Sequence, residues 1–348
     1  MDQKTLQNLA EVAAFKPSPE RRLFSASQDE IIYGLTTDIY FIRTRELLRH
    51  MGLDRTPVTA EIFSGKEGIL SGITEVRNLL VGLPIEVWSL PEGAVFGAKE
   101  VIMRISGAYD DFGIYETALL GMLASSSGWA TAAGKCREAA GSKSIVSFGA
   151  RHLHPAVAPV MERAAILGGA NGASCILGAK LAGSEPLGTM PHAVMLIVGD
   201  TLEVARHYRK VMPPGSPVII LVDTFKDEAE ETLRVAEALG KDLQGVRLDT
   251  ASERGGVTPG LVREIRARLD QAGCQHVKIF VSGGLTPERI RLLSEAGADS
   301  FGVGSYISGA AAIDMTMDIK EINGKPVAKR GRIPGVTPTS RLEKLITQ

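Results

Sequence analysis

The second half of the chain alternates short apolar runs with amphipathic segments. Helical patterns are clearest at 228–239, 261–272 and 286–296, where Thr286 is a predicted N-cap and Gly297 a predicted end. Such alternation predicts right-handed βαβ units and a parallel sheet. About seven strands fit an irregular α/β barrel better than an open sheet, which stays the alternative. The predicted strands are 145–148, 194–198, 218–222, 246–248, 277–281 and 301–303, with a weaker candidate near 174–177.

The first 120 or so residues have a different pattern. Short strand-like runs with Gly and Pro turns at 58–72 and 85–105 suggest an antiparallel or mixed sheet, with helices at 37–51 and around 113–128. The last stretch, 314–348, is rich in Lys, Arg, Gly and Pro. We expect it to fold back on the N-terminal layer, with a partly ordered tail as the alternative. The predicted domains are therefore an α/β sandwich (1–122 with 306–348) and a barrel (123–305).

Composition narrows the class of protein. Hydrophobic residues make up 44% and charged residues 23%, as in ordinary globular enzymes. The net charge of −1 provides no general attraction for nucleic acid or anionic membrane. No apolar run approaches the roughly 20 residues of a membrane span, and the first 20 residues lack the pattern of a signal peptide. Three distant cysteines argue against a disulfide framework or a zinc knuckle. We expect a cytoplasmic enzyme without nucleic-acid or membrane partners.

Two glycine turns follow neighbouring late strands. Gly283 and Gly284 come after Ser282, and Gly304 precedes Ser305. Such turns let several backbone N–H groups converge on an anion, and late barrel strands are a frequent place for phosphate. A single glycine turn would indicate packing, whereas two on successive strands favour phosphate binding.

Charged residues also stand at predicted strand ends. Asp223 and Asp249 end adjacent strands, where two carboxylates could hold Mg²⁺ or ribose hydroxyls; N-capping is the alternative, stronger for Asp223. Arg247 lies inside an apolar run, where an unpaired charge would be costly. Arg151 follows the first strand, and its guanidinium suits phosphate or carboxylate.

One histidine has a distinctive setting. His192 lies in GTMPHAVML, between a Gly188-Thr189 turn and a predicted strand. Histidine can serve as a base, a metal ligand or a phosphate-accepting nucleophile. A structural side chain is the competing interpretation, and the motif alone does not decide between the two. His152 and His154 follow Arg151 and could belong to the same site.

Taken together, the motifs resemble those of the nicotinate phosphoribosyltransferases, closest to the compact archaeal and bacterial branch. Each motif is weak alone, but their order and spacing give a specific match over nearly the whole chain. The segments are LTTDIYF (35–41), YDDFGIYETALLGMLASSSG (109–128), SFGARHLHPA (147–156), GTMPHA (188–193), LVDTF (221–225), GVRLDT (245–250), VKIFVSGGL (277–285), FGVGSYIS (301–308) and KRGRIPG (329–335).

The resemblance implies the type II fold, with a sandwich built from both chain ends and an irregular barrel. It also implies a homodimer, or a higher multiple of dimers, in which the N-terminal segment of one subunit completes the site of the other. Phe148 of one subunit and Tyr40 of the other would sandwich the pyridine ring, and Arg151 would face its carboxylate or the nearby phosphate. The implied residues for the ribose, pyrophosphate and 5′-phosphate are Arg247, Asp249, Thr189, Asp223, Ser282, Gly283, Gly284, Gly304 and Ser305.

The implied reaction joins nicotinate to phosphoribosyl pyrophosphate and releases nicotinate mononucleotide and pyrophosphate. His192 matches the histidine that relatives phosphorylate with ATP, so ATP is an expected co-substrate. Mg²⁺ is expected with the pyrophosphate, with Asp249 as a candidate ligand. Some relatives carry a cysteine-rich zinc knuckle near the C-terminus. No cysteine follows Cys274 here, and we therefore expect no zinc.

Other functions remain open at this point. A nicotinamide or quinolinate phosphoribosyltransferase would have the same fold. Quinolinate enzymes resemble this chain less and need a denser basic pocket, whereas nicotinamide enzymes are longer and place an aspartate near the amide, so that Glu185 leaves this alternative open. A non-catalytic sugar-phosphate sensor would have lost some of His192, Arg247 and Asp249, and all three are present.

Overall fold

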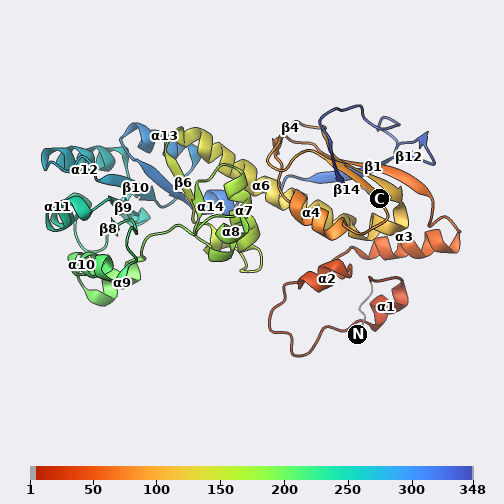
Figure 1. Cartoon of the computed structure of the whole chain (residues 1–348), viewed down its shortest axis with the longest axis horizontal. Coiled ribbons are helices and arrows are strands. Elements are labelled where there is room, and N and C mark those ends of the chain that lie inside the picture. The colour runs from red at the N-terminus through yellow and green to blue at the C-terminus, as the bar shows by residue number, and fades with distance from the viewer. Residues whose placement is uncertain (1–4, 347–348) are drawn as a thin grey trace. The chain divides into compact units, whose positions relative to one another are not determined.

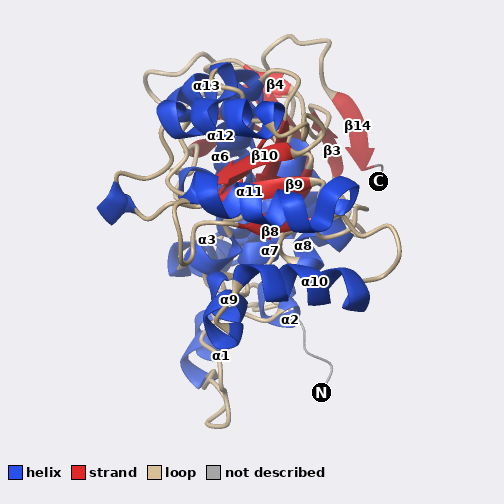
Figure 2. Ribbon diagram, turned by 90° about the vertical axis from the view of Figure 1, so that its left-hand side faces the viewer, coloured by secondary structure: helices blue, strands red, loops and turns tan. Residues whose placement is uncertain are grey.

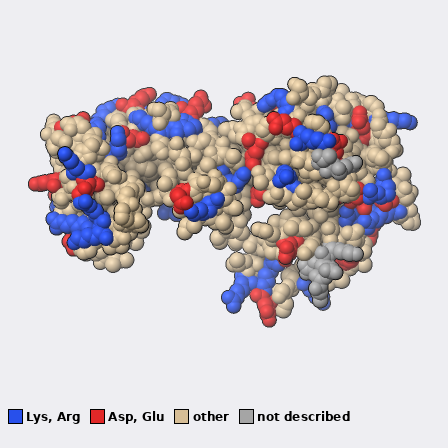
Figure 3. Space-filling model, in the orientation of Figure 1, with Lys and Arg blue, Asp and Glu red and all other residues tan. Residues whose placement is uncertain are grey.

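The computed structural model describes residues 5–346 and divides the chain into two compact units. The antiparallel unit comprises Met1–Gly128 with Ala311–Gln348, and the parallel unit comprises Trp129–Ala310. Figure 1 colours the chain by residue number, from red at the N-terminus to blue at the C-terminus. On the face in Figure 3, Lys and Arg side chains are interspersed with Asp and Glu, in agreement with the near-neutral net charge.

The antiparallel unit is built on a six-stranded sheet of order β13-β12-β1-β5-β3-β14. Its strands come from both ends of the chain, which confirms the expected return of the C-terminal stretch. Ile62, Met103 and Ile105 of the central strands are fully buried in its core. The strands are β1 (Pro57–Ser64), β3 (Glu86–Ser89), β5 (Val101–Ala108), β12 (Met315–Ile322), β13 (Lys325–Pro326) and β14 (Glu343–Ile346), with a separate pair β2 (Gly68–Ile69) and β4 (Val95–Phe96). The helices are α1 (Leu9–Ala14), α2 (Gln28–Ile32), α3 (Ile39–His50), α4 (Ile73–Leu80), α5 (Tyr109–Phe112) and α6 (Glu116–Ala140), the last of which continues into the parallel unit.

The parallel unit contains a six-stranded parallel sheet of order β7-β6-β11-β10-β9-β8. Helices α10 to α13 lie around its strands β8 to β10 (Figure 2). The strands are β6 (Ser144–Ser147), β7 (Gly172–Ala173), β8 (Ile219–Leu221), β9 (Gly245–Leu248), β10 (Lys278–Ser282) and β11 (Ser300–Val303). The helices are α7 (Ala158–Leu167), α8 (Ile176–Leu181), α9 (His192–Val198), α10 (Thr201–Val211), α11 (Glu228–Leu239), α12 (Pro259–Gln271), α13 (Pro287–Glu295) and α14 (Ser305–Ser308). The expected α/β class, with one unit built on a parallel sheet and another on an antiparallel sheet, is confirmed.

The strand predicted at 194–198 is wrong, because this run forms helix α9. Pro191 is its N-cap residue, and Gly199 ends it in the left-handed conformation at φ 87°. Only Met195 of the helix is buried, whereas Ile197 is 85% exposed. A five-residue apolar run has no period that separates a strand from a helix, so tertiary placement decided. His192 therefore begins a helix.

The candidate near 174–177 is also displaced, since β7 is Gly172–Ala173 and α8 starts at Ile176. The sheet has six strands rather than about seven. It is open between β7 and β8 in the described part of the chain, which fits an irregular, incompletely closed barrel.

The predicted limits of the helix at 286–296 are confirmed. The Thr286 hydroxyl accepts a hydrogen bond from the Arg289 N–H at 3.3 Å, and Gly297 follows the helix with φ 109°. This cap fixes the turn that precedes α13 at the sheet edge. No helix within residues 5–346 is both long enough and apolar enough to cross a membrane.

The half-buried carboxyl of Glu116 predicts a pH-dependent stability of the antiparallel unit. Burial, and secondarily Asp318, raises the pKa of Glu116 to about 7, although the Tyr109 hydroxyl donates to it at 3.3 Å. The folded state holds the Glu116 proton more tightly than the unfolded state, so proton binding adds to the free energy of unfolding. This stabilisation is fully present below about pH 4.5 and is lost as pH rises through about 7. We expect Glu116→Gln to unfold at the same temperature as the parent near pH 4 and a few degrees higher near pH 8. Thermal unfolding across this range, with exposed Glu237→Gln as control, checks it; an unchanged difference between the two pH values would contradict it.

Candidate active site

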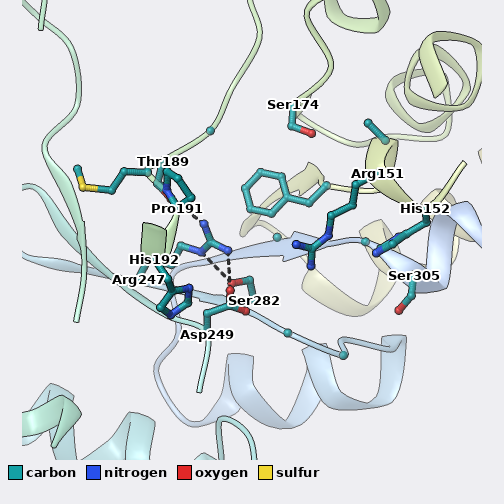
Figure 4. A pocket seen from close by; sticks show the side chains of 18 residues that line it. Arg151, His152, Ser174, Thr189, Pro191, His192, Arg247, Asp249, Ser282 and Ser305 are labelled. Atoms are coloured by element: carbon teal, nitrogen blue, oxygen red, sulfur yellow. Dashed lines mark hydrogen bonds and ion pairs between the residues drawn. The ribbon is translucent and has the colours of Figure 1, made fainter. Parts of the chain in front are cut away.

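A pocket of about 450 Å³ opens at the carboxyl ends of the parallel strands (Figure 4). It lies within the parallel unit, and the tips of β6, β9, β10 and β11 converge on it. This convergence is the arrangement on which the predicted chemistry depends. The lining residues are Phe148, Ala150, Arg151, His152, Ser174, Gly188, Thr189, Met190, Pro191, His192, Arg247, Asp249, Ser282, Gly283, Gly284, Gly302, Gly304 and Ser305.

Arg247 on β9 connects the parts of the pocket. Its Nε donates to Ser282 Oγ at 2.9 Å, Nη1 to Thr189 Oγ1 at 2.8 Å, and Nη2 to Asp249 Oδ2 at 2.9 Å. Its guanidinium carbon is also 5.2 Å from the centroid of the Phe148 ring. The charge inside the apolar run is thus paired, and one side chain fixes groups from separate segments.

Phe148 follows β6 and lies against a glycine. A Cβ on Gly302 would come within 2.5 Å of the Phe148 ring, so only glycine leaves room for the ring here. Phe280 is the neighbouring aromatic residue, with ring centroids 5.8 Å apart. The ring is a rigid apolar wall beside the Arg247 guanidinium, and a flat ligand could stack on it.

The two glycine turns lie in the pocket wall, as predicted. Gly283 and Gly284 have φ of 92° and 58°, and a Cβ on Gly283 would be 3.0 Å from Asp249 Oδ1. A Cβ on Gly304 would be 2.8 Å from the His152 ring. The backbone therefore approaches these side chains closely and stays accessible to an anion.

Asp223 lies behind the pocket wall. Its side chain is 1% exposed, and its Oδ2 accepts from the Asp249 N–H at 3.0 Å. Oδ1 is 3.3 Å from His192 Nε2, in ion-pair range but without a hydrogen bond. Burial raises the pKa of Asp223, and His192 opposes this shift. The N-cap of α11 is Asp227, so the capping alternative for Asp223 is wrong.

The remaining predicted residues are in different situations. Arg151 lines the pocket, and His152 Nδ1 is 2.9 Å from Ser308 Oγ. The His154 side chain does not line the pocket, and its ring accepts from the Ala156 N–H at 3.2 Å. Tyr40 lies on α3 of the antiparallel unit with 53% exposure and does not line this pocket. Its place in the site of a second subunit stays a prediction.

Sequence reasoning missed Ser174 and Gly302, which also line the pocket. Ser174 follows a two-residue strand, too short for a periodic signal. Gly302 lies inside β11, and although the FGVGSYIS segment contains it, only Gly304 and Ser305 of that segment were assigned a role.

A protein metal site is not formed by the described residues, among which no group of three or more His, Cys, Asp or Glu side chains gathers. Asp249 has one oxygen engaged by Arg247. Magnesium binding with Asp249 as a ligand therefore stays a prediction.

Family comparisons match both parts of the chain. The model "Quinolinate phosphoribosyl transferase, N-terminal domain" matches residues 38–127, and the corresponding C-terminal domain model matches residues 129–318. The chain belongs to the quinolinate phosphoribosyltransferase family. The predicted resemblance is thereby supported at the level of this family.

The similar proteins are named either nicotinate-nucleotide pyrophosphorylase or nicotinate phosphoribosyltransferase. The crystal structure of nicotinate-nucleotide pyrophosphorylase from Pyrococcus furiosus is 46% identical, covers 91% of this chain and 82% of its own, and superimposes with a TM-score of 0.87. Nicotinate phosphoribosyltransferase pncB2 of Mycobacterium tuberculosis is 31% identical over 69% of this chain and 52% of its own length. The chain thus spans about half the length of the first curated relatives that it matches. Human nicotinic acid phosphoribosyltransferase (TM-score 0.68, 19% identity, 86% of this chain and 77% of that one) shares the fold.

Proposed function

We propose that this chain transfers the phosphoribosyl group of phosphoribosyl pyrophosphate to the ring nitrogen of a pyridine carboxylic acid. The products are nicotinate mononucleotide and pyrophosphate, in NAD biosynthesis. The observation that carries the proposal is the Arg247 network, which joins Thr189, Asp249 and Ser282 beside the Phe148 ring and the glycine turns. The names of the relatives from Pyrococcus furiosus and Mycobacterium tuberculosis support the same product.

In this reaction the bond from the anomeric carbon to pyrophosphate breaks, and a bond to the pyridine nitrogen forms. The transition state resembles an oxocarbenium ion, so the pocket must neutralise the departing charge and hold the nitrogen in line. Arg247 provides positive charge, the glycine turns hold the 5′-phosphate, and Phe148 orients the ring. A bound Mg²⁺ would supply further positive charge to the pyrophosphate oxygens. The pyridine nitrogen is already nucleophilic, and no side chain has to remove a proton.

Charge in the pocket supports nicotinate as the base. Of the two arginines that line it, Arg247 is paired with Asp249, whereas Arg151 forms no ion pair among the described residues. One unpaired guanidinium suits a ring with one carboxylate. The curated relatives named nicotinate phosphoribosyltransferase support the same base.

Quinolinate is the second candidate. The family models and the name of the 46% identical structure support it more strongly than nicotinate with ATP coupling. In that reaction one ring carboxylate leaves as carbon dioxide. The second carboxylate requires a further polar partner, for which the His152 ring, in the same pocket as Arg151, is the candidate.

A product assay separates the candidates. The purified chain is given phosphoribosyl pyrophosphate and Mg²⁺ with nicotinate, nicotinamide or quinolinate, each with and without ATP. Mononucleotide and pyrophosphate from nicotinate without carbon dioxide release are the expected result. Quinolinate-dependent carbon dioxide release would assign the second candidate, and no product from any base would overturn the proposed function.

We further propose that His192 couples ATP to the transfer through a phosphohistidine. His192 lines the pocket at the start of α9, is 38% exposed, and faces the carboxylate of Asp223. The Asp223 carboxylate lies 3.3 Å from His192 Nε2 and orients the imidazole ring. His192→Ala is expected to abolish stimulation by ATP while ATP-independent transfer continues. Initial rates with and without ATP measure this.

The matched control is His207→Ala, since His207 lies exposed on α10 and does not line this pocket. It should respond to ATP as the parent does. If His192→Ala keeps full ATP stimulation, the coupling role is wrong.

A further inference from the structure

One fully buried carboxylate connects two loops of the pocket without lining it. Glu162 on α7 is 0% exposed. Its Oε1 accepts from the Gly149 N–H at 3.0 Å and the Ser147 hydroxyl at 3.2 Å. Its Oε2 accepts from the Cys175 N–H at 2.6 Å, and the Ser174 hydroxyl lies 3.3 and 3.4 Å from the two oxygens. These partners are all neutral hydroxyl and amide donors.

The partners of Glu162 belong to the segments that end β6 and β7. The first segment carries Phe148 and Arg151 into the pocket, and the second carries Ser174. Burying a carboxylate is costly, and this one is offset by donors drawn from both loops at once. A hydrophobic residue would fill the same space, so packing alone does not account for the charge.

We propose that Glu162 is a positioning residue that holds the two loops on the pyridine-binding side of the pocket in fixed positions relative to each other. It fixes the loop of Phe148 and Arg151 relative to Ser174, and none of its hydrogen bonds goes to the glycine turns after β10 and β11. This inference rests on the proposed phosphoribosyl transfer. Its consequence is specific: loss of Glu162 should weaken binding of the pyridine base more than binding of phosphoribosyl pyrophosphate.

Glu162→Gln is the sharpest variant because glutamine has the same shape. Its amide offers one acceptor oxygen, and its NH₂ group must face either the Gly149 N–H or the Cys175 N–H, donor against donor. One loop is thereby released. Glu162→Asp keeps the charge but is one methylene shorter, so it cannot reach both loops and should show the same effect more weakly.

Steady-state kinetics with each substrate varied test the proposal. We expect the KM for the pyridine base to rise on the order of tenfold in Glu162→Gln, as for a buried donor left without an acceptor, while the KM for phosphoribosyl pyrophosphate changes less than about twofold. Glu237→Gln, exposed on α11, is the matched control and should match the parent. Equal changes in both KM values, or a lower kcat with both KM values unchanged, would show a merely structural role and overturn the proposal.

Hydrogen exchange followed by mass spectrometry gives a readout that does not depend on activity. Amide exchange in residues 148–152 or 173–176 should be faster in Glu162→Gln than in the parent, with the β10 and β11 turns unchanged. Unchanged exchange in both loops would refute the positioning role even if the parent proved inactive. Absence of transfer by the parent would instead refute the proposed function.

Discussion

Arg247→Ala is expected to lower kcat/KM for phosphoribosyl transfer by about 10²–10³-fold, the loss typical when a preorganised charged donor is removed from a transition-state site. The Arg247 side chain is 15% exposed and donates to Thr189, Asp249 and Ser282. Its removal leaves the Asp249 carboxylate without its cation beside an anionic substrate. Initial rates of mononucleotide formation measure the loss, and thermal unfolding separates it from a folding defect.

Arg247→Lys and Arg268→Ala are the matched controls. Lysine keeps the charge but cannot bond three partners with a planar fork, and it should recover only part of the rate. Arg268 lies on α12 and pairs with Glu264 on the helix surface, so its loss should leave the rate unchanged. Retention of at least a tenth of the parent activity by Arg247→Ala would contradict the assigned role.

The same variant tests the proposed homodimer. If Tyr40 of one subunit serves the site of the other, mixed dimers of Arg247→Ala with Tyr40→Ala contain one intact site. Subunit exchange should then restore about a quarter of the parent activity, because half the dimers are mixed and each has one working site of two. No gain above the sum of the separate variants would count against a shared site.

Gly302→Ala is expected to raise the KM for the pyridine base by roughly tenfold or more, since overpacking of this kind costs about 1–3 kcal/mol. The added Cβ would lie 2.5 and 2.6 Å from two carbons of the Phe148 ring and 3.1 Å from Phe280. The ring must therefore leave its position and lose its contact with Arg247. Kinetics with the base varied measure the effect.

Gly121→Ala provides the control for a glycine replacement. Gly121 lies in α6 with nothing within 4 Å of its added Cβ, and alanine is favoured in a helix. This variant should keep the parent kinetics. An unchanged base KM in Gly302→Ala would mean that Phe148 does not contribute to base binding.

Several parts of the site were predictable because they follow from local order. Ser282, Gly283 and Gly284 come directly after an apolar strand, and the ends of parallel strands meet at one edge of a sheet. Arg247 was marked by an apolar run in which a charge must find a partner. By contrast, the run at 194–198 was assigned to the wrong element, since five apolar residues fit a strand or a helix equally well.

The sequence by itself determined the alternation of parallel strands with helices, the glycine turns and the motifs that mark the family. Each of these depends on neighbours close along the chain. Only the tertiary structure decided that Asp223 lies buried behind His192, that Gly302 makes room for Phe148, and that Glu162 ties two loops together. Burial and hydrogen bonding between distant segments exist only once the strands have assembled, and no local pattern encodes them.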